Sequence, residues 1–99
     1  MMNQQMINRL KKMQREMMEA EARLKGTIFT GTAGGGLVKV EVKGSKDIVS
    51  ISINPEILNP EDKEMIEDTI VAAINDAFRQ VDEETEEVMA PYTSLAGMF

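Results

Sequence analysis

The sequence predicts a small α+β protein in which a long helix, a three-stranded antiparallel sheet and a second long helix follow one another. Two changes in the spacing of apolar residues carry this prediction. Apolar residues recur every three or four positions up to residue 26, alternate with polar residues over 27–53, and return to helical spacing after residue 54. A chain of 99 residues, 42% of them hydrophobic, can form one domain, 1–99, around a modest core.

The first segment, residues 1–26, has the spacing of an amphipathic helix. Its apolar positions are separated by alternating steps of four and three, which place them in one stripe. Gly26 follows the last of them, with Arg23 and Lys25 in the preceding turn, as is typical of helix C-termini. We therefore expect a helix over about residues 2–25. The stripe consists of Met6, Leu10, Met13, Met17, Ala20 and Leu24.

Residues 27–53 have a period of two, which is typical of strands with one buried and one solvated face. In VKVEVK the valines alternate with charged residues, and Val49, Ile51 and Ile53 alternate with serines. The TIFTGT stretch predicts a further, shorter strand, and GSKD is suited to a hairpin turn. The expected sheet is a three-stranded antiparallel meander.

The third segment, residues 54–90, is predicted to be helical. Pro55 and Pro60 each follow an asparagine and occupy the first position of a turn or helix, where proline is favoured. Apolar residues then recur at helical spacing until Pro91, which we expect to end a helix of about thirty residues, or ~45 Å. Residues 91–99 would form a short tail.

The predicted helices are much longer than the predicted strands. A strand is ~20 Å long, whereas the first helix would be ~36 Å and the last ~45 Å, so both extend beyond the sheet. Pairing the helices covers only part of their apolar stripes, because Ile7 and Met18 widen the first one. A symmetric homodimer is the simplest way to cover the rest. We expect its interface at Met6, Leu10, Met13 and Met17.

Charge is distributed unevenly along the chain. Residues 1–26 carry six Lys or Arg against three Asp or Glu, residues 27–53 three against two, and residues 54–99 two against twelve. The net charges are therefore +3, +1 and −10, which give −6 for the whole chain. An acidic protein is unsuited to indiscriminate polyanion binding, but its basic first segment can hold a local anionic partner.

Basic residues gather on one side of the first helix. Lys11, Lys12 and Arg15 lie opposite the apolar stripe, and Arg9 and Arg23 flank it. This face is either an anion-binding surface or an ordinary solvated helix face. The glutamates that follow it in the sequence favour the second interpretation. Six of the nine methionines lie in the first eighteen residues, either as core filling or as an adaptable partner surface.

The composition argues against catalysis. The chain has no cysteine and no histidine, so disulfides, thiolate nucleophiles, structural zinc and the usual general base are excluded. Carboxylates in the acidic run 82–87 point around a helix and do not converge on a metal. The serines and threonines lack an activating base. We expect no enzyme activity, no metal site and no cofactor.

The glycine-rich stretch GTAGGG, residues 31–36, invites comparison with phosphate-binding loops. Such loops open a helix, and the Walker type places a lysine directly after its last glycine. Here Leu37 and Val38 follow and open a strand. The favoured interpretation is a loop that joins two strands, and close approach of its backbone to a partner is the alternative.

The N-terminal twenty residues are interrupted by charge every few positions. They contain neither the apolar core of a signal peptide nor a membrane span, and no later stretch supplies a span. We expect a soluble, cytoplasmic protein.

Several stretches occur here in a distinctive combination: a Met- and Gln-rich first helix, GTAGGGLVKVEVKG, ISINPEILNPEDKEMIEDTIVAAINDAF and a tail ending in GMF. Over essentially its whole length the chain resembles the YbaB/EbfC family of bacterial nucleoid-associated DNA-binding proteins. The resemblance is most specific in GGGLVKVEVKG and EDKEMIEDTIVAAINDA. It implies an α-β-β-β-α homodimer at the nucleoid, whose long helices project like tweezers and bind duplex DNA with little sequence preference.

The leading hypothesis is a homodimer that binds DNA phosphates without chemistry. Its contacts would be Arg9, Lys11, Lys12, Arg15, Lys39, Lys43 and Arg79. Because the last helix is strongly acidic, DNA would be held by the first helix or by the sheet and glycine loop. The alternative is a protein-interaction scaffold that docks another helix on its Met-rich stripe. Neither hypothesis involves a membrane or a small-molecule substrate.

Overall fold

The computed structural model describes the backbone of residues 3–96 and the side chains of residues 3–93. Helix, three strands, two short 3-10 turns and a long helix follow one another, which confirms the expected α-β-β-β-α order. The GMF motif lies outside the described residues. The bounds are α1, Gln4–Gly26; β1, Ile28–Ala33; β2, Val38–Lys43; β3, Ile48–Ile53; η1, Pro55–Ile57; η2, Pro60–Asp62; and α2, Lys63–Ala96.

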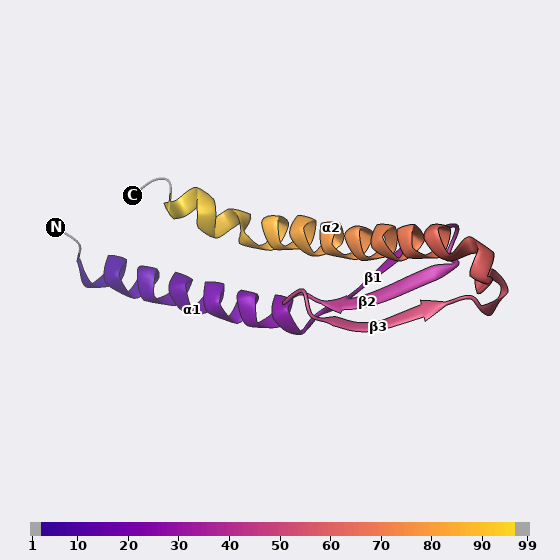
Figure 1. The fold of residues 1–99 in the computed structure, drawn as a ribbon. Coiled ribbons are helices and arrows are strands. Elements are labelled where there is room, and N and C mark those ends of the chain that lie inside the picture. Colours follow the sequence, from indigo (N-terminus) through magenta and orange to yellow (C-terminus); the bar gives the residue numbers. More distant parts are fainter. Residues whose placement is uncertain (1–2, 97–99) are drawn as a thin grey trace.

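The molecule is a rod of 70 × 21 × 16 Å. From the sheet, α1 and α2 extend side by side, so the first residues of α1 and the last residues of α2 lie at the same end of the rod (Figure 1). The overhang expected from the lengths of the elements is therefore present, and we call the overhanging pair of helices the arm. Over the described part of the chain, neither helix has an apolar stretch long enough to cross a membrane.

The sheet is an antiparallel meander with the order β1-β2-β3. Val38, Val40 and Val42 of β2 are completely buried beneath α2. We call this side of the sheet its inner face. The alternate residues of β2 are exposed on the outer face, as the period of two predicts.

Close packing of α2 on the sheet depends on small residues. Ala73 and Ala77 of α2 are fully buried and lie over Gly31 of β1. A Cβ atom at Gly31 would come within 2.7 Å of the Cβ atom of Ala77 and would also meet the carbonyl oxygen of Ala73. The glycine therefore allows the helix backbone to rest almost directly on the strand.

The junction between α1 and the sheet is equally tight, and we call it the α1–sheet junction. Leu24 of α1 is buried, and a Cβ atom at Gly44 would collide with its carbonyl oxygen. The backbone N–H of Gly44 donates to the carbonyl oxygen of Thr27 at 2.9 Å, and the Thr27 hydroxyl donates to that of Arg23 at 2.7 Å. These contacts fix the direction in which α1 leaves the sheet.

The two edges of the sheet differ. On the β1 edge, a carboxylate oxygen of Asp76 accepts from the backbone N–H of Thr32 at 3.0 Å, and the Gln80 amide donates to the carbonyl oxygen of Thr30 at 2.8 Å. Among the side chains of residues 3–93, none makes such a hydrogen bond to β3. Side chains of α2 thus cap one edge of the sheet and leave the other open.

Pro91 does not end the last helix, so this expectation is wrong. Helix α2 has 34 residues and continues through Pro91 to Ala96, and residues 91–96 are therefore helical rather than part of a tail. Proline removes one backbone hydrogen bond and crowds the carbonyl group of Glu87, but its fixed φ is compatible with a helix. The last turns of α2 are offset from the axis of the preceding ones (Figure 1), as a proline kink would produce.

The burial expected for β3 is also wrong. Val49 is 49% exposed and Ile51 is 44% exposed, although the alternation predicted a buried row. A bulge opposite Glu41 and Val42 shifts the register, so that Ile48 pairs with Val42. Helix α2 packs on β1 and β2 and scarcely touches β3, and the inner side of this strand is left uncovered.

Candidate nucleic-acid interface

The eleven basic residues divide into paired and unpaired ones. Ion pairs engage four of them: Lys12 with Glu16, Lys46 with Asp82, Lys63 with Glu67, and Arg79 with Asp76 and Glu83. Among the side chains of residues 3–93, no ion pair engages the other seven, which are Arg9, Lys11, Arg15, Arg23, Lys25, Lys39 and Lys43. Cations without an internal partner are the best placed to meet phosphate, so these seven mark the candidate surfaces.

Lys11, Lys12 and Arg15 are exposed on the side of α1 that faces away from α2. The buried Ala20 and Leu24 mark the opposite side of α1, which packs against the rest of the protein. The ion pair of Lys12 is long, 4.0 Å between Nζ and the carboxylate oxygen, and both side chains are largely exposed. Because such pairs are weak, Lys12 can also turn towards an external anion.

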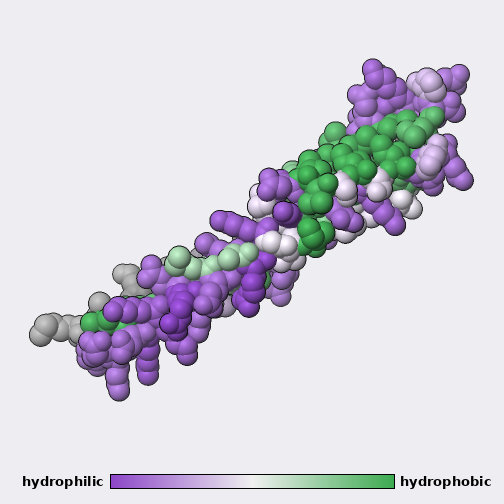
Figure 2. All heavy atoms as spheres, turned by 90° about the horizontal axis from the view of Figure 1, so that it is seen from below, coloured by the Kyte–Doolittle hydropathy of each residue, from purple (hydrophilic) through white to green (hydrophobic). Residues whose placement is uncertain are grey.

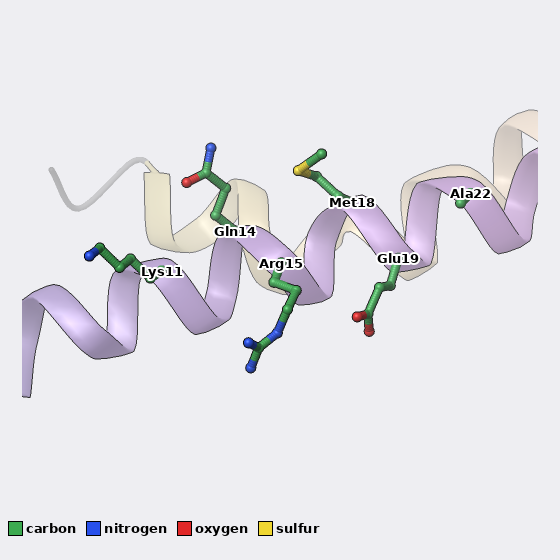
Figure 3. A pocket seen from close by; sticks show the side chains of 6 residues that line it. All are labelled: Lys11, Gln14, Arg15, Met18, Glu19 and Ala22. Atoms are coloured by element: carbon green, nitrogen blue, oxygen red, sulfur yellow. The ribbon is translucent and has the colours of Figure 1, made fainter.

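A shallow depression, lined by this helix alone, lies on the outer face of α1. Arg15 and Glu19 point to one side of it, and Gln14 and Met18 point to the other (Figure 3). A surface built from one helix cannot enclose a small molecule, whereas an extended partner can lie along it. The residues that line it are Lys11, Gln14, Arg15, Met18, Glu19 and Ala22.

The acidic run 82–87 of α2 lies near the α1–sheet junction rather than beside these cations. Thr85, within the run, lines the same small depression as Leu24 of α1. At 1.5 Å per residue, Arg15 and Lys11 are roughly 14 and 20 Å from Leu24 along the helix. Glu86 and Glu87 continue from Thr85 towards the end of the arm and are up to about 3 Å nearer, which leaves separations of roughly 10 and 16 Å along the helix. These separations still exceed the Debye length of about 8 Å at physiological ionic strength, so the acidic run is largely screened from the two cations.

Lys39 and Lys43 occupy a different surface, the outer face of the sheet. Both are exposed, and they alternate with the buried valines of β2. Glu41 lies between them on the same face, without an ion pair to either. The structure therefore separates the basic residues singled out in the sequence into a set on α1 and a set on the sheet.

Arg79 belongs to neither set. Its guanidinium group bonds the carboxylate of Asp76 and also that of Glu83, 3.3 Å away. The pKa of Asp76 lies below its ordinary value, first because the N–H of Thr32 donates to it and then because of Arg79. The hydrogen bond to Asp76 in turn raises the pKa of Arg79. Arg79 thus supports the cap on the β1 edge, and a phosphate would have to compete with two carboxylates for it.

The glycine loop joins β1 to β2, as predicted. Gly34, Gly35 and Gly36 have φ values of 66°, 68° and 91°, in the region that other residues rarely adopt. Glu64 and Asp68 of α2 line a depression together with Gly34. Carboxylates at this position oppose the approach of an anion to the loop.

The methionine stripe of α1 becomes less covered towards the N-terminus. Leu10, Met13 and Met17 are half-buried, whereas Met6 is 45% exposed. The stripe proposed as a dimer interface is therefore partly occupied within a single chain.

A more extensive apolar surface lies beside α2, over β3, and was missed in the sequence. Ile48, Ile51 and Val71 are between 44% and 55% exposed, and Ile74 and Phe78 are half-buried next to them. We call these five residues the α2–β3 groove. Figure 2 shows apolar side chains gathered over the sheet end of the rod and hydrophilic ones over the arm.

The cause of this exposure is geometric. A helix is about 10 Å wide, whereas three strands at about 4.8 Å spacing, with their side chains, form a wider layer. A single helix therefore cannot cover the whole inner face, and α1 does not help because it leaves at the end of the sheet. The apolar alternation of β3 was visible in the sequence, but it does not reveal whether the covering helix comes from the same chain.

The geometry is that of a small α+β protein, a meander with two overhanging helices, in which the described cations without ion pairs lie on open surfaces. The YbaB/EbfC DNA-binding family model matches residues 1–98 of this chain. The chain belongs to this family, which confirms the resemblance found in the sequence.

Relatives agree with this assignment. A nucleoid-associated protein of Chloroflexus aurantiacus is 43% identical over 99% of this chain and 100% of its own length. Nucleoid-associated protein OB0030 of Oceanobacillus iheyensis is 40% identical over 95% of this chain and 96% of its own. The crystal structure of the uncharacterized protein HP0035 from Helicobacter pylori has the same fold, with a TM-score of 0.74 and 29% identity over 94% of this chain and 99% of that one.

Proposed function

We propose that the protein binds duplex DNA at the nucleoid as a homodimer, largely without sequence preference and without catalysing a reaction. The observation that carries this proposal is the group of exposed cations on the outer face of α1. Lys11 and Arg15 have no internal ion pair among the described residues, and they lie beyond the screening distance of the acidic run.

Phosphates are the expected contact points of these side chains. Lysine and arginine on an open, convex helix face reach the DNA backbone, which carries no direct sequence information. Base recognition would require side chains that enter a groove in a fixed geometry, and α1 offers long flexible lysines instead. Affinity should therefore be similar for unrelated sequences of equal length.

The homodimer is supported by the α2–β3 groove. Its residues form an apolar surface next to the open edge of β3. One charge borders it, because the Lys46 ammonium group lies 5.7 Å from the centre of the Phe78 ring. We propose that a second copy of the chain occupies the groove. The groove consists of one helix and one uncovered strand, so the same helix of a second copy can cover the strand. Placing α2 of each copy over β3 of the other fills both grooves symmetrically. The side of each chain that faces away from α2 remains free for DNA.

A titration of labelled duplex DNA at about 50 and 200 mM salt tests the proposal. The logarithm of affinity should fall with the logarithm of salt concentration by about 0.9 per phosphate contact. Four contacts from one protomer predict a slope near −3.6, or a loss of roughly 150-fold, and engagement of both protomers predicts about twice that slope. No measurable affinity at the lower salt concentration would refute DNA binding.

A second candidate function is a protein-interaction scaffold. Met6 is 45% exposed, and the methionine stripe behind it is only half-buried, so another helix could pack there. In that case, a charge at Met6 should abolish binding of the partner helix, and DNA affinity should be negligible at both salt concentrations.

A further inference from the structure

One continuous stripe of α2 contacts the sheet first and α1 next. Ala73, Ala77 and Val81 are buried at the sheet, and Thr85 and Val88 are half-buried further along the arm. These positions are spaced by steps of four, four, four and three, so they lie on one side of the helix. The sheet and α1 therefore form one layer, and α2 forms a second layer above it (Figure 1).

The two layers carry opposite charge. The first, residues 3–53, has nine Lys or Arg against five Asp or Glu, a net charge of +4. The second, α2, has two against nine, a net charge of −7. All seven cations that have no ion pair to a described side chain lie in the first layer. The cations of this layer, rather than the acidic α2, are thus favoured to meet an anionic polymer.

We propose that the outer faces of α1 and of the sheet form one continuous phosphate-binding track, along which a single DNA duplex lies. Lys11, Lys12 and Arg15 supply its arm end, and Lys39 and Lys43 supply its sheet end. The inference rests on the proposed function and adds the sheet to it, together with the length of DNA that one protomer covers.

The length of the track follows from the backbone. From Lys11 to the end of α1 at Gly26 is about 22 Å, and Lys43 lies next to this end because Gly44 bonds Thr27. Lys39 lies four residues further along β2, or about 13 Å. The total of about 35 Å corresponds to one helical turn of DNA, or about 10 base pairs.

The outer face of the sheet has the chemistry that backbone contacts require. Thr32 and Ser52 pair in register with Lys39, and Thr30 and Ser50 pair with Glu41. Hydroxyl groups and lysines are common donors to DNA phosphates. Three carboxylates also lie on or beside the track: Glu41 on the sheet, and Glu19 and the Lys12 partner Glu16 on α1. On the sheet we therefore expect the duplex to contact the lysines on either side of Glu41 rather than the centre of the face.

The test is the salt dependence of DNA affinity for the Lys39→Ala/Lys43→Ala double variant. On a duplex of about 24 base pairs, loss of two phosphate contacts should reduce the magnitude of the slope by roughly 1.8 for each track engaged. Lys63→Ala is the matched control, because Lys63 is an exposed lysine of the acidic layer. Its slope should equal that of the unchanged protein.

Duplex length provides a second readout. A hairpin-closed duplex of about 6 base pairs is only ~20 Å long and cannot span the track, so the double variant should lose less of its slope on it than on the long duplex. An unchanged slope of the double variant on the long duplex would overturn the inference and leave α1 as the only contact. Complete loss of binding in the double variant, with normal binding after changes in α1, would also overturn it, because the sheet alone would then hold DNA. Absence of DNA binding by the unchanged protein would instead refute the proposed function itself.

Discussion

Gly31 of β1 lies directly beneath Ala77 of α2, so closely that a Cβ atom on the glycine would be 2.7 Å from the Cβ atom of Ala77. Both residues belong to the contact that holds the acidic layer on the basic one. The sizes of these two residues therefore set the distance between strand and helix.

Gly31→Ala should lower the melting temperature. The added methyl group would push α2 away from β1, and overpacking of this kind costs about 1–3 kcal/mol. For a chain of this size, each kcal/mol corresponds to a change of about 4–8 °C, measurable by circular dichroism. Gly26→Ala is the control, because nothing lies within 4 Å of the added atom. Equal melting temperatures for both variants would contradict the proposed role of Gly31.

The cap on the β1 edge should make stability depend on acid. Asp76 has a pKa below its ordinary value of 3.8 in the folded protein, so its carboxylate stabilises the fold above the unfolded pKa. This contribution is lost as the pH falls through the folded pKa. The difference in melting temperature between the protein and its Asp76→Asn variant should therefore be present at about pH 7 and shrink towards about pH 2.5. The exposed Asp68→Asn is the control, and a difference for Asp76→Asn that does not change with pH would exclude this linkage.

Replacement of Lys11, Lys12 and Arg15 together by alanine should weaken DNA binding for unrelated sequences alike. Each lost phosphate contact should reduce the salt slope by about 0.9, and the ranking of sequences should not change. Light scattering should show an unchanged oligomeric state, because these side chains lie away from the α2–β3 groove. Affinity equal to that of the unchanged protein would remove α1 from the interface.

A charge in the α2–β3 groove should separate the proposed dimer. Ile51→Asp places an unpaired carboxylate in the proposed contact, where it would lose its hydration. Light scattering should then report the chain mass of 11.0 kDa instead of twice this mass. The monomer should keep its helix content, because Ile51 is already 44% exposed within one chain.

Ser50→Asp is the matched control for this change, since it adds the same group to the outer face of the same strand. It should remain dimeric. Met17→Asp tests the interface expected from the sequence. If this variant is monomeric and Ile51→Asp is not, the methionine stripe of α1 forms the dimer contact.

Pro91→Ala should strengthen the end of the arm. Alanine restores a backbone N–H donor for the carbonyl group of Glu87 and removes the clash of the proline ring. In the interior of a helix this exchange is worth about 3 kcal/mol, and near the end of the arm a gain of about 1 kcal/mol is expected. Far-ultraviolet circular dichroism should show more helix, and a decrease would mean that the kink is required for packing.

The order and type of the elements could be predicted because each depends on local spacing. The heptad pattern from Met6 to Leu24 and the alternation in β2 are both reproduced in the structure. Pro91 was misjudged because its rigid φ is compatible with a helix, and the lost hydrogen bond alone does not stop one. The exposure of β3 could not be predicted because it depends on the width of α2 relative to the sheet.

The candidate site was only partly accessible from the sequence. The cations of α1 and β2 were identifiable as charges, but their ion pairs depend on neighbours in space. Arg79 illustrates this, since Asp76 and Glu83 engage it three and four residues away on the same helix. The segregation of charge into two layers could not be predicted, because it depends on the sheet and α1 lying on the same side of α2.

The close contact between Gly44 and the carbonyl group of Leu24 also limits the angle at which α1 leaves the sheet. Helix α1 has 23 residues and is therefore about 35 Å long. A change of about 10° at its base would move its far end by ~6 Å, a distance comparable to the width of the DNA minor groove. The size of one residue in a strand turn thus sets the position of the distant end of α1, and with it the place at which the proposed complex would present this helix to DNA.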